Sequence, residues 1–511
     1  MISIVLKPRQ IGYVALILLA IVVCVYSFYI DLYPQKSNTD LWTHLAIVNE
    51  LKADTFSDIN APFYPDGIRD PRGGSYLAAV AIVSKILNIS TINTYLFFGI
   101  VNVVFFLFAA TIFAREFFYS RRTAFIFPIL LIFLWGASKN VAAGMFSLNE
   151  ILWMGPFVHF FALGCTLLVL AFMNRYLRIE KYTRSNYISV LFLSYIVWNS
   201  HILSGVFLFV AIATYVLVSF FQKRYPRRKA ITLALVPIIV VVINFIWPLY
   251  SQVSFFEKQG AAITQTNPTI ENISDIDRGT LLRAWISLAG FSLLGFFMLI
   301  RKKRYLFFFI LFIVATVIIL SGLNPNSVRF YWRFFPLLVF SGAVGWAVFL
   351  QRLHWRTVSV IIVSLLTIGS AYTSEKMMVF HDWEPYTYDQ SYYGGSAIDF
   401  GIVKNLPARS VVFTDAIESH IFSGLTGLNV VGVRPQHASF TQTAVQAQGY
   451  YDIKLAYTNP ETIYSTIEQY GITHFLLKNP PEEGDGDLTE YLISHFRKLN
   501  QDNRFILLST Q

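Results

Sequence analysis

A short polar segment, residues 37–67, carries the first side chains with types and spacing suited to chemistry. Asp40 and His44 stand four residues apart in SNTDLWTHLAIVNE. On a helix, this spacing puts a carboxylate and an imidazole on one face. The pair follows an apolar run, residues 11–30, and could transfer protons or bind a metal ion beside a membrane. An ordinary solvated helix would explain the same spacing, so the pair needs support from other features.

Four further residues are candidates because of where they stand in the sequence. Glu150 precedes an apolar run, where a carboxylate either serves a function or faces the positive end of a helix. His201, in WNSHILSG, could be a ligand or a hydrogen-bonded structural residue. Arg329 and Arg333, in NPNSVRFYWR, could extend toward water at a bilayer edge or hold an anionic partner such as a lipid-linked phosphate.

The composition identifies the environment of these residues. Of the 511 residues, 55% are hydrophobic and 14% are charged, and the mean hydropathy is +0.53, which indicates a polytopic membrane protein. Residues 76–87 form a run too short to cross a bilayer, so we expect a helix on or dipping into the membrane. Eleven apolar runs approach bilayer length, at residues 11–30, 94–114, 124–137, 152–173, 188–198, 203–221, 231–250, 281–300, 306–320, 335–350 and 358–371.

Charge gives an orientation to these eleven spans. The basic clusters stand at residues 7–9, 115–122, 175–184, 223–229, 301–304 and 352–356. Eleven spans put all of these clusters on one side, which the positive-inside rule makes the cytoplasm. The net charge of +10 therefore reflects orientation, and we expect no nucleic-acid partner. The N-terminus is expected to be cytoplasmic, and the first outer loop (31–93), the six candidate residues and the C-terminus to be extracytoplasmic.

The C-terminal part has a different pattern. Residues 410–415, 429–433, 473–478 and 505–509 resemble short buried strands, and residues 417–425, 462–470 and 488–499 resemble helices. Alternating strands and helices predict a small α/β domain. We therefore divide the chain into a transmembrane module, 1–373, and an extracytoplasmic α/β domain, 374–511.

The six candidates together suit one reaction. Asp40, Glu150, His44, His201, Arg329 and Arg333 supply two carboxylates, two imidazoles and two guanidinium groups near the headgroup level. A carboxylate can deprotonate an incoming hydroxyl while fixed positive charge stabilises a departing lipid phosphate.

The motifs resemble those of the GT-C superfamily of integral membrane glycosyltransferases, which includes oligosaccharyltransferase catalytic subunits and protein mannosyltransferases. In the oligosaccharyltransferase branch, a D-x-x-x-H motif, a Y-P-x-G turn and a helix that does not cross follow the first span. This chain has Asp40 to His44, then YPDG at 64–67, then residues 76–87. AGMFSLNE, ending at Glu150, is similar to the second-loop motif but is one residue longer and lacks its aspartate. RFYWRF resembles the arginine-bearing outer loop near the donor phosphate.

The resemblance implies a GT-C fold and transfer of a sugar from a polyprenyl-phosphate or polyprenyl-diphosphate donor. Asp40 would be the general base or a metal ligand, and Glu150 a second acid. The two carboxylates could share Mg²⁺ or Mn²⁺, although a metal-independent mechanism is our leading hypothesis because the third acid is missing. Arg329 and Arg333 would hold the phosphate, and His44 and His201 would line the pocket.

The acceptor is expected to differ from that of oligosaccharyltransferase. Where that enzyme has W-W-D-Y-G, this chain has TDAIESH at 414–420. We therefore expect a lipid-linked glycan, a cell-wall polymer or a protein hydroxyl in place of an asparagine sequon, at a prokaryotic plasma membrane.

Two other classes of protein compete with this interpretation. A transporter or flippase of lipid-linked glycans would also be polytopic, but no matched pair of Gly/Pro-broken spans is evident and few charges fall inside the spans. A membrane-anchored assembly protein would need far fewer spans.

Overall fold

The structure, a computed structural model, forms two compact units. Unit 1 comprises residues 1–36, 96–243 and 276–387, and unit 2 comprises residues 37–95, 244–275 and 388–511. The described residues are 39–53, 73–118, 121–133, 155–178, 183–222, 225–245, 282, 285–286, 305–321, 334–352, 400–408, 410–415, 419–433, 443–481 and 486–511.

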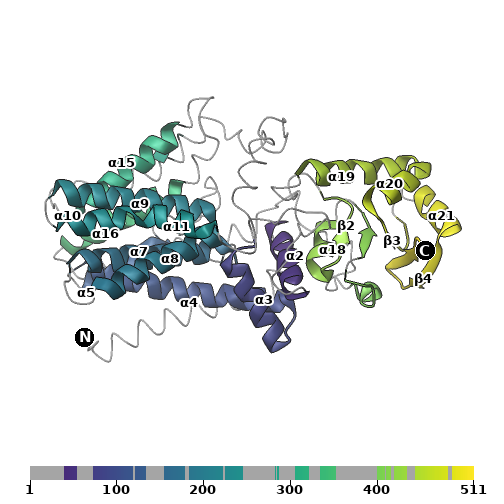
Figure 1. Ribbon diagram of the computed structural model, residues 1–511, viewed down its shortest axis with the longest axis horizontal. Helices are drawn as coiled ribbons and strands as arrows, with labels where there is room; N and C mark the ends of the chain where they lie inside the picture. Colours follow the sequence, from purple (N-terminus) through teal and green to yellow (C-terminus); the bar gives the residue numbers. More distant parts are fainter. Residues whose placement is uncertain are drawn as a thin grey trace. The chain divides into compact units, whose positions relative to one another are not determined.

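Unit 1 is a helical bundle (Figure 1). Helix α4 begins in unit 2 and continues into the bundle. The described helices are α4 (Thr91–Phe117), α5 (Arg121–Phe133), α7 (Val158–Arg178), α8 (Thr183–Ser200), α9 (Ile202–Phe221), α10 (Arg227–Ala234), α11 (Val236–Asn244), α15 (Leu306–Ser321) and α16 (Phe335–Arg352).

An aromatic core holds four of these helices together. The fully buried ring of Phe113 on α4 lies 5.3 Å from Phe127 on α5, 5.9 Å from Phe308 on α15 and 5.0 Å from Phe340 on α16, measured between ring centroids. Tilted and edge-to-face contacts at these distances add to the large apolar area that each ring buries.

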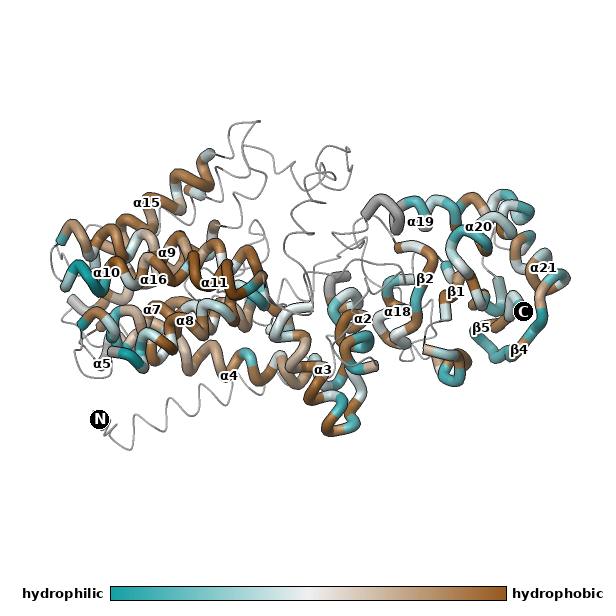
Figure 2. The backbone as a smooth tube through the Cα atoms, in the orientation of Figure 1, coloured by the Kyte–Doolittle hydropathy of each residue, from teal (hydrophilic) through white to brown (hydrophobic). Residues whose placement is uncertain are grey.

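The helices of the bundle are hydrophobic along most of their length (Figure 2). On α4, the exposed side chains Phe97, Val101, Val104 and Phe108 recur every three to four residues, so they form one stripe. Helices α4, α7 and α9 are each long and apolar enough to cross a bilayer. An apolar stripe that faces outward is stable only against lipid or another apolar surface, so the chain is an integral membrane protein.

The predicted spans agree with the described helices where the two can be compared. The runs at 94–114, 203–221, 306–320 and 335–350 fall on α4, α9, α15 and α16. The run at 231–250 is divided at Leu235 into α10 and α11. The runs at 11–30 and 358–371, and all but three residues of the run at 281–300, lie outside the described residues, so the count of eleven spans stays a prediction.

Unit 2 contains α2 (Thr39–Ala53), α3 (Ser75–Leu87) and a mixed five-stranded sheet in the order β2-β1-β3-β5-β4. Strand β1 pairs in parallel with β2 and β3, and β5 pairs antiparallel with β3 and β4. The strands are β1 (Val411–Phe413), β2 (Asn429–Val430), β3 (His474–Lys478), β4 (Arg497–Gln501) and β5 (Phe505–Ser509), and the helices of this part are α18 (Ser419–Thr426), α19 (Thr443–Thr458), α20 (Ile463–Tyr470) and α21 (Gly486–His495).

The central strands are buried on both faces, which explains why their sequences are continuously apolar. Phe475 and Leu477 of β3 join one hydrophobic core with residues of α19, α20 and α21 (Figure 1). On the other side, Phe400 packs on Phe422 of α18 and on Phe505 of β5, with ring centroids 5.1 and 5.4 Å apart. The four predicted strands and the expected small sheet are confirmed.

In this part, one predicted helix is wrong at its end and one helix was not predicted. The predicted helix at 488–499 is wrong at its end, because α21 stops at His495 and β4 follows. Strand β4 owes its conformation to antiparallel pairing with β5, from Arg497 opposite Ser509 to Gln501 opposite Ile506, which no local pattern reveals. Helix α19 was not predicted. The proposed division at residue 373 lies outside the described residues.

Candidate functional site

Asp40 lies in the first turn of α2, and His44 lies one turn later on the same helix. The predicted helical spacing of this pair is therefore confirmed for the backbone. Helix α2 is buried on most of its surface, with Leu41, Trp42 and Leu45 at most 4% exposed. A helix so enclosed has little freedom to rotate, so its first turn is held in a fixed direction.

His44 is anchored at one ring nitrogen. Its Nδ1 lies 2.7 Å from the hydroxyl of Tyr95, a fully buried residue of α4. The imidazole itself is half-buried. A hydrogen bond between this ring nitrogen and a buried tyrosine fixes the orientation of the imidazole.

Asn49, further along α2, joins three segments of unit 2. Its Nδ2 donates a hydrogen bond of 2.8 Å to the carbonyl oxygen of Gly424 on α18, and its Oδ1 accepts one from the hydroxyl of Thr91 on α4. A Cβ atom at Gly424 would lie 2.7 Å from the carbonyl oxygen of Trp42, so only glycine permits this approach of α18 to α2. Sequence analysis gave no role to Asn49 or Gly424.

In unit 1, His201 is the N-cap of α9. Its Nδ1 accepts a hydrogen bond of 3.2 Å from the backbone N–H of Ser204 and lies 2.8 Å from the hydroxyl of the same serine. This is the structural role left open in the sequence.

A second histidine, which sequence analysis missed, accompanies His201. The ring of His159, in the first turn of α7, lies 5.9 Å from the ring of His201. Both imidazoles are half-buried. The only sequence signal was the position of His159 at the start of an apolar helix just after Gly155 and Pro156.

The remaining candidates lie outside what the structure describes. These are the residues Glu150, Arg329 and Arg333 and the side chain of Asp40. His44 belongs to unit 2 and His201 to unit 1. Among the described residues, no group of three or more His, Cys, Asp and Glu side chains could hold a metal ion.

No protein-family model and no curated protein matches the sequence. Solved structures do match the fold. The apo oligosaccharyltransferase of Archaeoglobus fulgidus matches with a TM-score of 0.53 and 11% identity, covering 90% of this chain and 69% of that chain. Apo ArnT of Cupriavidus metallidurans matches with a TM-score of 0.58 and 13% identity, covering 98% of both chains. The chain has the GT-C fold.

The likeness extends to a third protein of the same fold. The mycobacterial arabinofuranosyltransferase AftD matches with a TM-score of 0.57 and 10% identity, covering 99% of this chain and 40% of that one. At identities of 10–13%, these likenesses concern the GT-C fold and carry no residue roles. They confirm the fold expected from the motifs at residues 40–44 and 64–67.

Proposed function

We propose that this chain is an integral membrane glycosyltransferase that moves a sugar from a polyprenyl-phosphate or polyprenyl-diphosphate donor to an acceptor at the outer face of the membrane. The GT-C fold, shared with ArnT over 98% of both chains, is the observation that carries the proposal. One ArnT structure is bound to undecaprenyl phosphate, and one structure of A. fulgidus AglB contains a dolichol-phosphate and an inhibitory peptide. We infer a lipid-linked donor of this class.

Asp40 is assigned the role of general base. It removes the proton from the acceptor hydroxyl as the acceptor oxygen bonds to the anomeric carbon of the sugar. The bond between that carbon and the phosphate oxygen breaks, and the lipid phosphate leaves with the electron pair. The enclosed helix α2 supports this role, because a buried, cross-braced helix keeps a base within reach of one substrate position.

The two arginines are assigned to the leaving group. Arg329 and Arg333 bind the donor phosphate and stabilise the charge that develops on it. His44 and His201 line the donor pocket, with His44 oriented by Tyr95. Glu150 is the second acidic group. Asp40 and Glu150 supply hard oxygen donors that suit Mg²⁺ or Mn²⁺, and our leading version of the mechanism does without the ion.

The acceptor is proposed to be a lipid-linked glycan, a cell-wall polymer or a protein hydroxyl. The segment that replaces the W-W-D-Y-G motif supports an acceptor other than an asparagine sequon. Its Asp415 forms an ion pair of 3.4 Å with Lys478, and its His420 is buried on α18. Asp415 is thus paired and His420 is enclosed within the α/β part of the chain.

Substitution of the base tests the proposal. The full chain is reconstituted in liposomes with undecaprenyl-phosphate mannose, glucose or galactose and a cell-envelope extract as acceptor. Release of undecaprenyl phosphate is then followed by mass spectrometry. Asp40→Asn is expected to lower the release rate by about 10²-fold or more, the usual contribution of a positioned base. The control Glu490→Gln removes an exposed carboxylate from α21 and is expected to have no effect.

Two outcomes would contradict the proposal. Full activity of Asp40→Asn would remove Asp40 from the role of base. Movement of the intact donor between leaflets with no release of undecaprenyl phosphate would identify a flippase. Addition of EDTA to the active chain tests the metal: a loss of release that Mg²⁺ or Mn²⁺ restores would favour the metal-dependent version.

A further inference from the structure

Three of the connections between helices of unit 1 carry a strong excess of positive charge. The connections α4–α5, α7–α8 and α9–α10, at residues 115–122, 175–184 and 222–229, contain twelve Lys and Arg residues and two acidic residues. Contacts between the described helices bring these helix ends together. Glu116 at the end of α4 bonds to Arg175 and Arg178 of α7, and Lys229 of α10 donates to the carbonyl oxygen of Tyr176.

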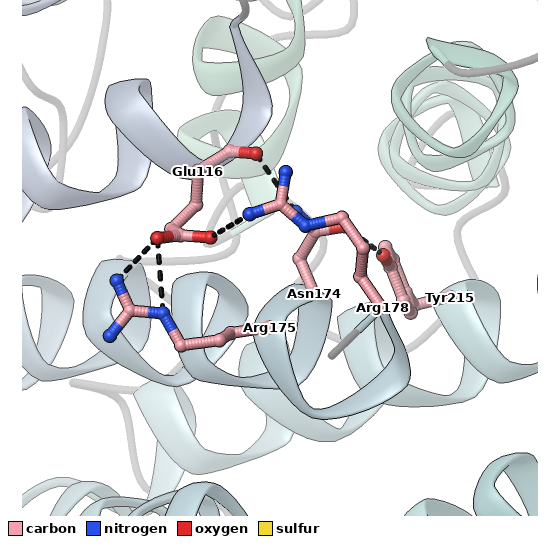
Figure 3. Close-up of polar contacts among 5 residues, drawn as sticks. All are labelled: Glu116, Asn174, Arg175, Arg178 and Tyr215. Carbon is pink, nitrogen blue, oxygen red and sulfur yellow. Dashed lines mark hydrogen bonds and ion pairs between the residues drawn. The ribbon is translucent and has the colours of Figure 1, made fainter. Parts of the chain in front are cut away.

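Glu116 organises the centre of this basic end (Figure 3). Its side chain is only 9% exposed. One carboxylate oxygen accepts bonds from Nε and Nη2 of Arg175, and the other accepts a bond of 3.0 Å from Nη2 of Arg178. A buried carboxylate is stable only when it is paired in this way. The two guanidinium groups therefore flank the carboxylate of Glu116 (Figure 3).

Buried hydrogen bonds fix the base of the cluster. Asn174 donates through Nδ2 to the backbone carbonyl of Glu116, at 2.9 Å, and so satisfies an oxygen at the end of α4. The hydroxyl of Tyr215 on α9 donates to Oδ1 of Asn174 at 2.8 Å (Figure 3). The cluster thus links α4, α7 and α9, and the positions of Arg175 and Arg178 are set before any ligand arrives.

The arginines have binding capacity beyond what Glu116 uses. One carboxylate neutralises one of two positive charges. Within the part of the chain that the structure describes, Arg175 keeps its Nη1 donors, and Arg178 keeps its Nε and Nη1 donors. Their side chains are 40% and 36% exposed, so a ligand can reach them. A phosphate group, like a carboxylate, matches the geometry of planar guanidinium donors.

Apolar side chains next to the charges indicate a lipid as the source of that phosphate. Phe220 and Phe221 end α9, Ile188 lies in the second turn of α8 and Ile231 in the second turn of α10, and all four are exposed. The guanidinium of Arg227 lies over the ring of Phe220, 5.4 Å from its centroid. Exposed apolar groups beside fixed cations match a lipid molecule, with its acyl chains on the former and its headgroup on the latter.

We propose that Arg175 and Arg178, aligned by Glu116, form a binding site for the phosphate of an anionic phospholipid headgroup at the basic end of the bundle. This site is separate from the donor site proposed above and does not depend on the glycosyltransferase assignment. Its ligand would be a lipid of the membrane that surrounds the protein.

Native mass spectrometry of the detergent-purified full chain, titrated with phosphatidylglycerol or phosphatidylcholine, tests the site. The Arg175→Gln/Arg178→Gln variant is expected to weaken phosphatidylglycerol binding at least fivefold and to leave phosphatidylcholine binding unchanged. Arg228→Gln, which removes an exposed cation of α10 that no described contact holds, is expected to change binding less than twofold. Inorganic phosphate at millimolar concentration is expected not to compete.

Three results would overturn the proposal. An equal loss from Arg228→Gln would show that summed charge, and not the aligned pair, binds the lipid. Competition by inorganic phosphate would identify a free-anion site. Unchanged phosphatidylglycerol binding in the double variant would remove the site altogether. Should the double variant fail to fold, the single variant Arg178→Gln gives the same comparison with Arg228→Gln.

Discussion

At the scale of single residues, hydrogen bonds between distant segments decide which polar side chains are available for chemistry. His44 and His201 were equal candidates in the sequence, yet one bonds to Tyr95 and the other caps α9. Hydrogen bonding also holds His474, a residue with no role in the proposed donor site. It begins β3, where its Nδ1 lies 2.9 Å from the hydroxyl of Thr473, and that hydroxyl also contacts the backbone of Val411.

Burial lowers the pKa of His474 below its ordinary value of 6.5, because the partly buried site disfavours the charged imidazolium. The unfolded chain then binds more protons than the folded chain, so stability is present above the unfolded pKa and decreases as the pH falls through 6.5 toward the folded pKa. We expect lower hydrogen-exchange protection of the β3 amides at pH 5 than at pH 7.5, after correction for intrinsic exchange rates. His474→Gln should remove this difference, and a difference that persists would assign it to another group.

At the scale of elements, the close fit of α2 against α18 holds the helix whose first turn contains Asp40. The contact depends on Gly424, and the bond from Asn49 to the Gly424 carbonyl locks it. Neither feature has a sequence signature, because a glycine inside an eight-residue helix usually weakens it.

Gly424→Ala is expected to destabilise unit 2 by about 1–3 kcal/mol, the usual result of overpacking a close contact. The new Cβ would meet the carbonyl oxygen of Trp42 at 2.7 Å and its Cα at 3.0 Å, so α2 must shift. Thermal unfolding of the full chain, with release of undecaprenyl phosphate as a second readout, measures both effects. Gly486→Ala is the matched control, since a Cβ there would meet nothing within 4 Å. Equal melting temperatures for the two variants would contradict the packing argument.

At the scale of the whole molecule, the open question is orientation. Basic residues favour the cytoplasmic side, and the eleven-span count then puts the α/β part outside. Asp40 and the proposed lipid site at Arg175 and Arg178 would accordingly serve opposite faces of the membrane.

Cysteine labelling in spheroplasts tests this arrangement. In a background without Cys24 and Cys165, Lys404→Cys is expected to react with a membrane-impermeant maleimide from outside, and Arg228→Cys only after the membrane is permeabilised. Both positions are exposed in the structure, so the side of the membrane on which each lies, and not its burial, determines the labelling. Labelling of both positions from the same side would refute the odd number of spans between the basic end of the bundle and the α/β part.

The sequence by itself determined the membrane class, the apolar helices, four of the five strands and the helical spacing of Asp40 and His44. These features arise from interactions between near neighbours or from composition, so local periodicity records them. Only the tertiary structure decided that α18 closes on α2 at Gly424, that His159 accompanies His201, that residues 497–501 form β4, and that Glu116 aligns two arginines. Each of these depends on residues tens to hundreds of positions apart or on pairing across a sheet, and the free energy of such contacts exists only once the chain has brought them together.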